Sequence, residues 1–320
     1  MGGCLFAGAA ATTQQNPLGA PELAHGEKMS GSPDAETPKQ LLRRYGIAPK
    51  KQLGQNFMID PRALERVVQA AEVTPADEVL EIGAGIGTLT ERLLEHAGRV
   101  VAVELDAQLV AVLQERLGSH PRLQIVAGDI LRLRPADYFT APYKVVGNIP
   151  YYITSAILRH LLEAQPRPTM LVLTMQKEVA ARILSREKWS LLAVSVHFYG
   201  RPRLMGHISR HAFYPVPQVD SAILRVDVSP QPAVPVPDTR LFFRVVKAGF
   251  SAPRKQLRNT LAHGLGVEPE AVEQALSAAG IDPRRRAETV SLEEWGQICR
   301  VLGPALVGSL PAEEPEAEEL

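Results

Sequence analysis

The sequence predicts an α/β protein in which a mostly parallel, helix-covered sheet precedes a small domain of helices. Short apolar runs alternate with amphipathic segments through the first two thirds of the chain, and this alternation is typical of βαβ units. The runs are apolar at both alternating positions, which indicates strands buried on both faces of a parallel sheet. A proline-rich stretch at 229–239 then precedes a purely helical pattern, so we expect a linker there.

The pattern places each element along the chain. Strands are expected at 78–83, 99–104, 123–129, 143–148 and 169–176. Helices are expected between and after them at 88–97, 107–118, 154–163 and 177–184. Two later runs, at 195–208 and 220–228, resemble strands near the sheet edge, as an antiparallel hairpin. The helical region is expected to contain helices at 239–250, 254–265, 269–280 and 291–303.

Composition divides the chain into four regions. Residues 1–38 are rich in small residues and proline without apolar periodicity, so we expect a disordered extension. The α/β domain is expected at 39–230, the helical domain at 231–305, and an acidic disordered tail at 306–320. No apolar stretch approaches the roughly 20 residues that span a bilayer. Cys4 and Cys299 offer neither a disulfide framework nor metal-ligand spacing, so we expect a cytoplasmic protein without a metal.

The net charge of zero conceals an uneven distribution. The first 38 residues carry four acids and one base, and the last ten carry five acids and no base. Residues 39–310 therefore hold 34 basic and 26 acidic side chains. A basic body between acidic ends suits a polyanion, because Lys and Arg release condensed counterions when they bind phosphates. A generic solvated surface is the alternative.

Three strand ends in sequence order predict a nucleoside pocket. Gly83, Gly85 and Gly87 allow a tight turn with close backbone approach to a ligand after the first strand. Glu104 ends the second strand and is placed to accept both hydroxyls of a ribose. Asp129 ends the third and can receive an adenine amino group, although either acid alone could be a helix N-cap. Because Thr88 stands where a dinucleotide fingerprint has its third glycine, the pocket favours S-adenosylmethionine over NAD.

The stretch "GNIPYY" (147–152) follows the fourth strand and lies beside that pocket. Asn-x-Pro is common in turns, but here it supplies what adenine N6 methylation needs. The Asn148 side-chain oxygen and a backbone carbonyl near Pro150 can accept the two amine hydrogens, which favours a pyramidal nitrogen facing the methyl group. Pro150 holds the loop rigid, and Tyr151 can stack on the unstacked target base.

Over 39–303 the chain resembles the ribosomal RNA adenine N6,N6-dimethyltransferases that modify small-subunit rRNA. Its landmarks include "KKQLGQNFMID" (50–60), "LEIGAGIGTLT" (80–90), "VVGNIPYYITS" (145–155), "FYPVPQVDSAIL" (213–224) and "FSAPRKQLRNTL" (250–261). The resemblance implies an S-adenosylmethionine-dependent methyltransferase Rossmann-like fold. It also implies two methyl transfers to each of two adjacent adenosines in a hairpin loop near the 3′ end of that rRNA, late in subunit assembly.

The resemblance also assigns residues. Asn148, Pro150 and Tyr151 match the catalytic tetrapeptide, and Phe213 matches an aromatic that packs on the target base, unless it is a core phenylalanine. The cofactor-binding residues that it implies are Gln55, Asn56, Met58, Gly83, Glu104, Asp129 and Asn148. Met58 stands where the family often has Leu, a volume-conserving change.

The implied partner is small-subunit rRNA, in the form of an immature 30S subunit, bound by a monomer. From Arg240 to Arg258 the chain has six bases and no acid. Within this run Arg254, Lys255 and Arg258 are the predicted RNA phosphate contacts, with a solvated helix face as the alternative. Three other functions stay open: a large-subunit rRNA adenine methyltransferase of the macrolide-resistance type, a non-catalytic RNA-binding assembly factor, and a DNA adenine methyltransferase. The last usually has a second proline where Ile149 stands.

Overall fold

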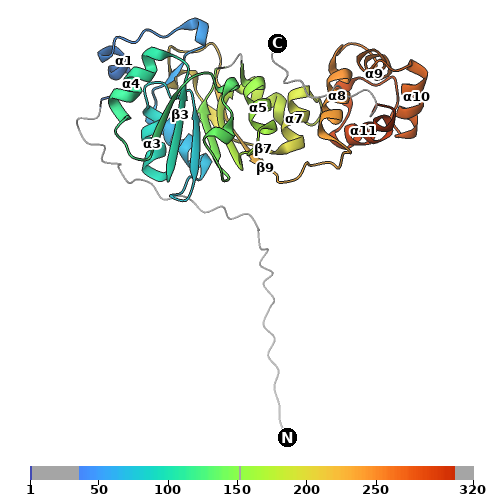
Figure 1. Ribbon diagram of the computed structural model, residues 1–320, viewed down its shortest axis with the longest axis horizontal. Helices are drawn as coiled ribbons and strands as arrows, with labels where there is room; N and C mark the ends of the chain where they lie inside the picture. The colour runs from blue at the N-terminus through green and yellow to red at the C-terminus, as the bar shows by residue number, and fades with distance from the viewer. Residues whose placement is uncertain (2–35, 151–152, 307–320) are drawn as a thin grey trace. The chain divides into compact units, whose positions relative to one another are not determined.

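A seven-stranded mixed sheet forms the centre of the α/β region (Figure 1). The computed structural model describes residues 1, 36–150 and 153–306, and Thr37–Leu320 belongs to one compact unit. The strand order is β4-β3-β2-β5-β6-β9-β7. The strands span β2 (Glu78–Ile82), β3 (Arg99–Glu104), β4 (Leu123–Ala127), β5 (Lys144–Asn148), β6 (Met170–Gln176), β7 (Gly200–Ile208) and β9 (Ser221–Val228). Five strands, β4, β3, β2, β5 and β6, are parallel to one another. Strand β9 runs antiparallel to β6, and β7 runs antiparallel to β9. This arrangement confirms the predicted fold class.

Helices cover both faces of this sheet. The first group is α2 (Pro61–Ala71), α3 (Thr88–His96) and α4 (Ala107–Leu117); the second is α5 (Thr154–Glu163), α6 (Lys177–Leu184) and α7 (Leu191–Tyr199). Alternate residues along β2 separate the two cores: Val79 packs with the first group and Leu80 with the second. Because both faces are covered, the central strands carry apolar residues at both alternating positions, as the sequence indicates.

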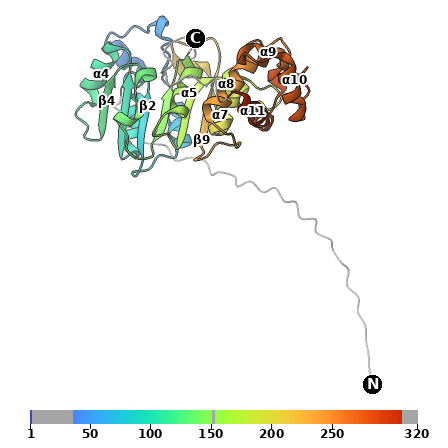
Figure 2. The ribbon, with the colours of Figure 1, turned by 45° about the vertical axis from the view of Figure 1, so that its right-hand side comes forward.

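Four further helices pack against one another after the proline-rich segment, coloured orange to red in Figure 1 and seen from another side in Figure 2. They are α8 (Thr239–Phe250), α9 (Leu257–Leu265), α10 (Pro269–Ala278) and α11 (Leu292–Leu306). Phe242 of α8 stacks on Phe198 of α7 with ring centroids 4.5 Å apart, and both are fully buried. Apolar packing thus continues from the α/β region into these helices. The predicted domain boundary at 230/231 stays a prediction.

The N-terminal part of the described chain adds a short helix and a two-stranded ladder. Helix α1 (Pro38–Arg44) begins at a capping box between Thr37 and Gln40, within the last residues of the expected extension. Residues 2–35 of that extension, and 307–320 of the expected tail, lie outside the described residues. Strand β1 (Phe57–Met58) pairs antiparallel with β8 (Phe213–Tyr214), which brings two sequence landmarks together.

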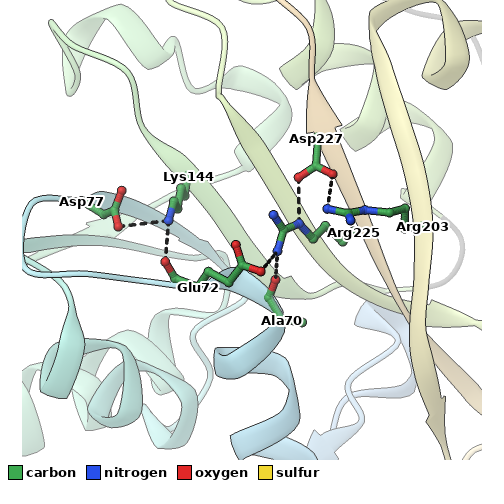
Figure 3. A network of polar contacts seen from close by, with 7 residues as sticks. All are labelled: Ala70, Glu72, Asp77, Lys144, Arg203, Arg225 and Asp227. Carbon is green, nitrogen blue, oxygen red and sulfur yellow. Dashed lines mark hydrogen bonds and ion pairs between the residues drawn. The ribbon is translucent and has the colours of Figure 1, made fainter. Parts of the chain in front are cut away.

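A polar network joins the carboxyl end of α2 to strands β9 and β5 (Figure 3). The Arg225 side chain is only 6% exposed and donates to the Ala70 carbonyl (3.0 Å), the Glu72 carboxylate (2.7 Å) and the Asp227 carboxylate (2.7 Å). Lys144 of β5 donates to the Glu72 carbonyl at 2.7 Å. The network holds α2 in place, and α2 begins directly after the segment that lines the pocket described below.

Two predicted elements are wrong in part. Residues 195–199 belong to helix α7 rather than to the edge strand, which begins at Gly200. Ser190 caps this helix, and its apolar residues are buried all round, so packing overrides their β propensity. Helix α9 begins at Leu257, so Arg254 and Lys255 lie in the turn after α8 rather than in a helix.

Candidate active site

A pocket opens at the carboxyl ends of the strands, where the sheet order reverses between β2 and β5. Such a reversal leaves a crevice between the loops that leave neighbouring strands in opposite directions. The pocket is lined by Leu64, Leu109, Ile153, Ile157 and residues within five ranges: 53–58, 82–89, 103–105, 128–130 and 148–150. All the sequence-predicted cofactor residues are among them, whereas Phe213, Arg254, Lys255 and Arg258 are not.

The turn after β2 exposes its backbone to this pocket. Gly83 and Gly85 have φ angles of 71° and 59°, a conformation that side chains rarely adopt. A Cβ on Gly83 would lie 3.4 Å from the Asn148 backbone oxygen, and one on Gly85 would lie 3.4 Å from the Phe57 ring. The turn therefore allows a ligand to approach the main chain closely.

Glu104 forms the floor of the pocket at the end of β3. Its Oε2 accepts from the Gly85 backbone N–H at 2.9 Å, and its Oε1 accepts from the Asp106 N–H at 2.9 Å. Burial raises the pKa of this carboxyl, and the backbone donors of Asp106, Gly85 and Leu105 partly oppose that shift. Each oxygen keeps acceptor capacity beyond its backbone partner, so the carboxylate can receive vicinal hydroxyls.

Asp129 and Leu105 line the neighbouring wall. Asp129 caps a short 3₁₀ helix (Ile130–Arg132) by accepting from the Leu131 N–H at 3.0 Å through Oδ1. The cap uses one oxygen and leaves the other available to an amino group. Leu105 is 53% exposed, which is unusual for a residue next to a buried strand end, and it offers an apolar surface to a ring.

Asn148 is held in one orientation by the segment across the pocket. Its Nδ2 donates to the Asn56 carbonyl at 2.8 Å. A carbonyl can only accept, so the amide nitrogen must face Asn56 and the Oδ1 acceptor must face the other way. No described residue donates to that Oδ1. The geometry gives β5 a fixed, half-buried acceptor at its carboxyl end.

Hydrogen bonds hold the first two residues after Asn148, Ile149 and Pro150. Ile149 is 2% exposed, and its N–H donates to the Thr174 carbonyl at 3.3 Å. The Pro150 carbonyl accepts from the Thr154 hydroxyl at 3.3 Å. Tyr151 lies outside the described residues, so its stacking role stays a prediction.

The segment before β1 carries the other predicted cofactor residues. Gln55 directs its side chain to Asp106 (Nε2 to Oδ2, 2.9 Å) and to the Lys50 backbone N–H (2.8 Å), so its amide is engaged by the protein. Asn56 binds Asn148 through its backbone carbonyl, and Met58 is 4% exposed within the core.

Phe213 lies beneath the pocket rather than in it. It is 1% exposed, pairs with Met58 across the β1–β8 ladder and belongs to the core that packs under α2. To touch a target base, Phe213 would have to leave this core. Its contact with the base therefore stays a prediction, whereas its packing in the core is observed.

Arg254 and Lys255 are exposed in the turn between α8 and α9. Arg258, in the first turn of α9, is ion-paired to Glu273 at 2.6 Å. The three predicted phosphate contacts therefore differ. Arg254 and Lys255 lie on an exposed turn, whereas the charge of Arg258 is partly neutralised by Glu273.

Sequence reasoning missed four features in or next to the pocket. Phe57 packs on Gly85, Leu105 presents an apolar surface, and Lys50 reaches Asp106 at 2.7 Å. Glu81, two residues before Gly83, is fully buried. A hydrophobic residue directly after a strand-end acid was a usable signal for Leu105, whereas the contacts of Lys50 and Phe57 depend on tertiary folding.

Comparison with known proteins agrees with this geometry. A family model described as "Ribosomal RNA adenine dimethylase" matches residues 47–303. The chain belongs to the ribosomal RNA adenine dimethylase family. A curated relative from Dehalococcoides mccartyi, "Ribosomal RNA small subunit methyltransferase A", is 45% identical over 267 residues, which cover 82% of this chain and 91% of that protein.

Solved structures show the same fold. The crystal structure of the 23S rRNA methyltransferase ErmE has a TM-score of 0.62 at 31% identity, covering 78% of this chain and all of that one. A dimethyladenosine transferase from Plasmodium falciparum has a TM-score of 0.66 at 22% identity, covering 77% and 96%. The region matched to the rRNA adenine dimethylase family runs from Ile47 to Gly303, so it includes both the pocket and helices α8–α10.

Proposed function

We propose that this protein transfers methyl groups from S-adenosylmethionine to N6 of two adjacent adenosines near the 3′ end of small-subunit (16S) rRNA, giving N6,N6-dimethyladenosine. The observation that carries the proposal is the fixed amide of Asn148, whose Oδ1 faces away from Asn56 at the edge of a pocket suited to a nucleoside. Family membership and a 45% identical small-subunit methyltransferase support it.

The residues of the pocket fit S-adenosylmethionine. Glu104 would accept the ribose hydroxyls, Asp129 the adenine amino group, and the open Gly83–Gly85 backbone would lie against the cofactor. When bound, the cofactor supplies an electrophilic methyl group on a positive sulfonium.

Asn148 then prepares the acceptor nitrogen. The N6 lone pair of adenine is delocalised into the ring and attacks poorly. An acceptor that binds an amine hydrogen favours the tetrahedral nitrogen, and Asn148 Oδ1 is already oriented before substrate arrives. The nitrogen would gain a C–N bond as the methyl–sulfur bond of the bound cofactor breaks, and the surplus proton would leave to water. A general base would not be required, because the positive sulfonium would leave as a neutral thioether and so provide the driving force.

The RNA would be held outside the pocket by phosphate contacts. Arg254 and Lys255 supply exposed charge on the α8–α9 turn, with Arg258 beside them. We include in the proposal that the substrate is an immature small subunit, and that the protein acts as a cytoplasmic monomer. The described residues contain no helix long and apolar enough to cross a membrane.

A large-subunit specificity is the second candidate, because ErmE is 31% identical and has the same fold. Purified small and large subunits from cells that lack these modifications, incubated separately with the protein and labelled S-adenosylmethionine, test the choice. We expect label in small-subunit rRNA at two adjacent adenosines, as the N6,N6-dimethyl product. Label confined to large-subunit rRNA would replace the proposal with the second candidate. Subunit binding without any label would indicate a non-catalytic assembly factor.

A further inference from the structure

Three side chains join the pocket-lining segment 50–57 to the start of α4. Lys50 Nζ lies 2.7 Å from Asp106 Oδ1, and Gln55 Nε2 lies 2.9 Å from Asp106 Oδ2. The Lys50 backbone N–H donates to Gln55 Oε1 at 2.8 Å, which closes the triangle. Both oxygens of Asp106 and both polar atoms of the Gln55 amide are therefore engaged.

Asp106 is the member of this group of three residues that is held most firmly by the rest of the protein. Its side chain is 4% exposed, and its Oδ1 also caps α4 by accepting from the Gln108 N–H at 3.1 Å. Burial would raise the pKa of Asp106, but hydrogen bonds from Lys50, Gln55 and Gln108 outweigh it and lower the pKa below the ordinary value. Its own N–H donates to Glu104. The anchor is thus charged at neutral pH and rigidly tied to the pocket floor.

The segment is fixed at its far end by different contacts. Phe57 and Met58 pair with Tyr214 and Phe213, and the Ile59 N–H donates to the Ala212 carbonyl at 2.8 Å. Between this ladder and Lys50 lie residues 51–56, of which Leu53 to Asn56 line the pocket. Moving them away from the pocket breaks the Asp106 contacts and leaves the ladder intact.

We propose that Lys50, Gln55 and Asp106 form a latch that holds segment 50–57 closed over the pocket and sets the rate at which the cofactor leaves. These are positioning residues for the reaction; the inference rests on the proposed function only in taking the pocket to bind S-adenosylmethionine. The closed segment is also the one in which the Asn56 carbonyl orients Asn148, so retention of cofactor and readiness of the acceptor are linked.

The latch predicts a change in cofactor release. Lys50→Met removes one arm, and Asp106→Asn keeps the helix cap and a side-chain acceptor but removes the charge. We expect each to raise the dissociation rate of S-adenosylhomocysteine, measured by stopped-flow displacement on the full chain, about three- to tenfold. The double variant should release no faster than the faster single variant, because the Lys50 side chain acts through the Asp106 carboxylate. Melting temperatures report any general loss of stability separately.

Lys51→Met is the matched control, since Lys51 is the next residue, carries the same charge and is exposed. An equal rise in dissociation rate for Lys51→Met would overturn the latch, as would unchanged rates for Lys50→Met and Asp106→Asn. Strict additivity in the double variant would also contradict it. Glu104→Ala, measured alongside, separates the two claims: unchanged cofactor affinity there would count against the pocket itself and hence against the proposed function.

Discussion

Glu81 lies beneath the glycine turn on β2, with both carboxylate oxygens buried and without a hydrogen bond of normal geometry among the described residues. Burial raises its pKa to about 8; the Thr90 hydroxyl partly opposes this, and the charge of Glu104 adds to it. At neutral pH Glu81 is therefore a neutral acid in the core. Two nearby carboxyls thus differ in role: Glu81 stays protonated beneath the turn, and Glu104 binds backbone N–H groups at the pocket floor.

The first prediction concerns the pH dependence of stability. The folded pKa of Glu81 lies above its unfolded value near 4.5, so its contribution to stability is fully present below about pH 4.5 and is lost as pH rises toward 8. Glu81→Gln does not ionise, so relative to wild type it should gain a few kcal/mol between pH 5 and pH 8. Urea unfolding of both proteins at the two pH values measures this. Glu78→Gln is the control, because Glu78 is on the same strand but partly exposed, and it should show no such gain. If the free energy of unfolding changes with pH in the same way for wild type and Glu81→Gln, Glu81 is not a buried neutral acid.

The second prediction tests the pocket floor. Glu104→Gln presents an amide to two backbone donors, Gly85 N–H and Asp106 N–H, but it has one acceptor oxygen instead of two. Cofactor affinity measured by calorimetry should fall roughly ten- to a hundredfold, corresponding to about 1.5–3 kcal/mol for a charge-assisted bond. Glu95→Gln, on the exposed side of α3, is the control. Equal affinities for wild type and Glu104→Gln would exclude ribose binding at this position.

At the scale of elements, the Arg225 network explains how helix α2 keeps the pocket-lining segment before it in place. Helix α2 follows β1 after two residues, and its carboxyl end is bound to β9 through Arg225 and to β5 through Lys144 (Figure 3). A buried guanidinium with three acceptors is costly to remove, because its partners remain buried without a donor.

The third prediction is therefore that Arg225→Met destabilises the protein by about 3–5 kcal/mol, measured by denaturant unfolding at neutral pH. Arg201→Met, an exposed substitution on edge strand β7, should change stability by less than about 0.5 kcal/mol. A similar small change for Arg225→Met would show that the network is dispensable.

The fourth prediction separates the cations of the α8–α9 turn. Replacing Arg254 and Lys255 by Ala should weaken RNA binding and lower the slope of log affinity against log salt by about 1.4–1.8, at roughly 0.7–0.9 per phosphate contact. Arg258→Ala alone should lower it less than Arg254→Ala, because Arg258 is already paired with Glu273. Binding titrations from low to moderate salt measure the slopes. Slopes equal to wild type would identify the turn as a solvated face.

For the whole molecule, the local hydrophobic pattern and the order of the strands were enough to predict much of the fold and of the pocket. The βαβ alternation, the burial of central strands and the gathering of Gly83, Glu104, Asp129 and Asn148 follow from periodicity and from the rule that ligands bind at carboxyl strand ends. Helix α2 was not predicted, although Asp60 and Pro61 form an N-cap and first-turn signal.

What the sequence left undetermined depends on tertiary contacts. The buried apolar helix at 191–199 reads like a strand until its packing is known. The engagement of Gln55 by Asp106 joins residues 51 positions apart, and burial of Phe213 follows from its pairing with β1. The protonation of Glu81 is likewise a property of the assembled core, because no local sequence feature reports desolvation.

The proposed mechanism depends on the orientation of the Asn148 amide, and Asn148→Ala tests it most directly. The variant and the wild type are incubated with unmethylated small subunits, and digested rRNA is analysed by mass spectrometry, with cofactor and subunit binding measured in parallel. We predict dimethyladenosine from wild type, and a hundred- to a thousandfold slower reaction for Asn148→Ala with binding little changed, since a lost transition-state contact costs about 3–4 kcal/mol. Near-normal dimethylation by Asn148→Ala would contradict the mechanism, and only monomethyladenosine from wild type would contradict the proposed product.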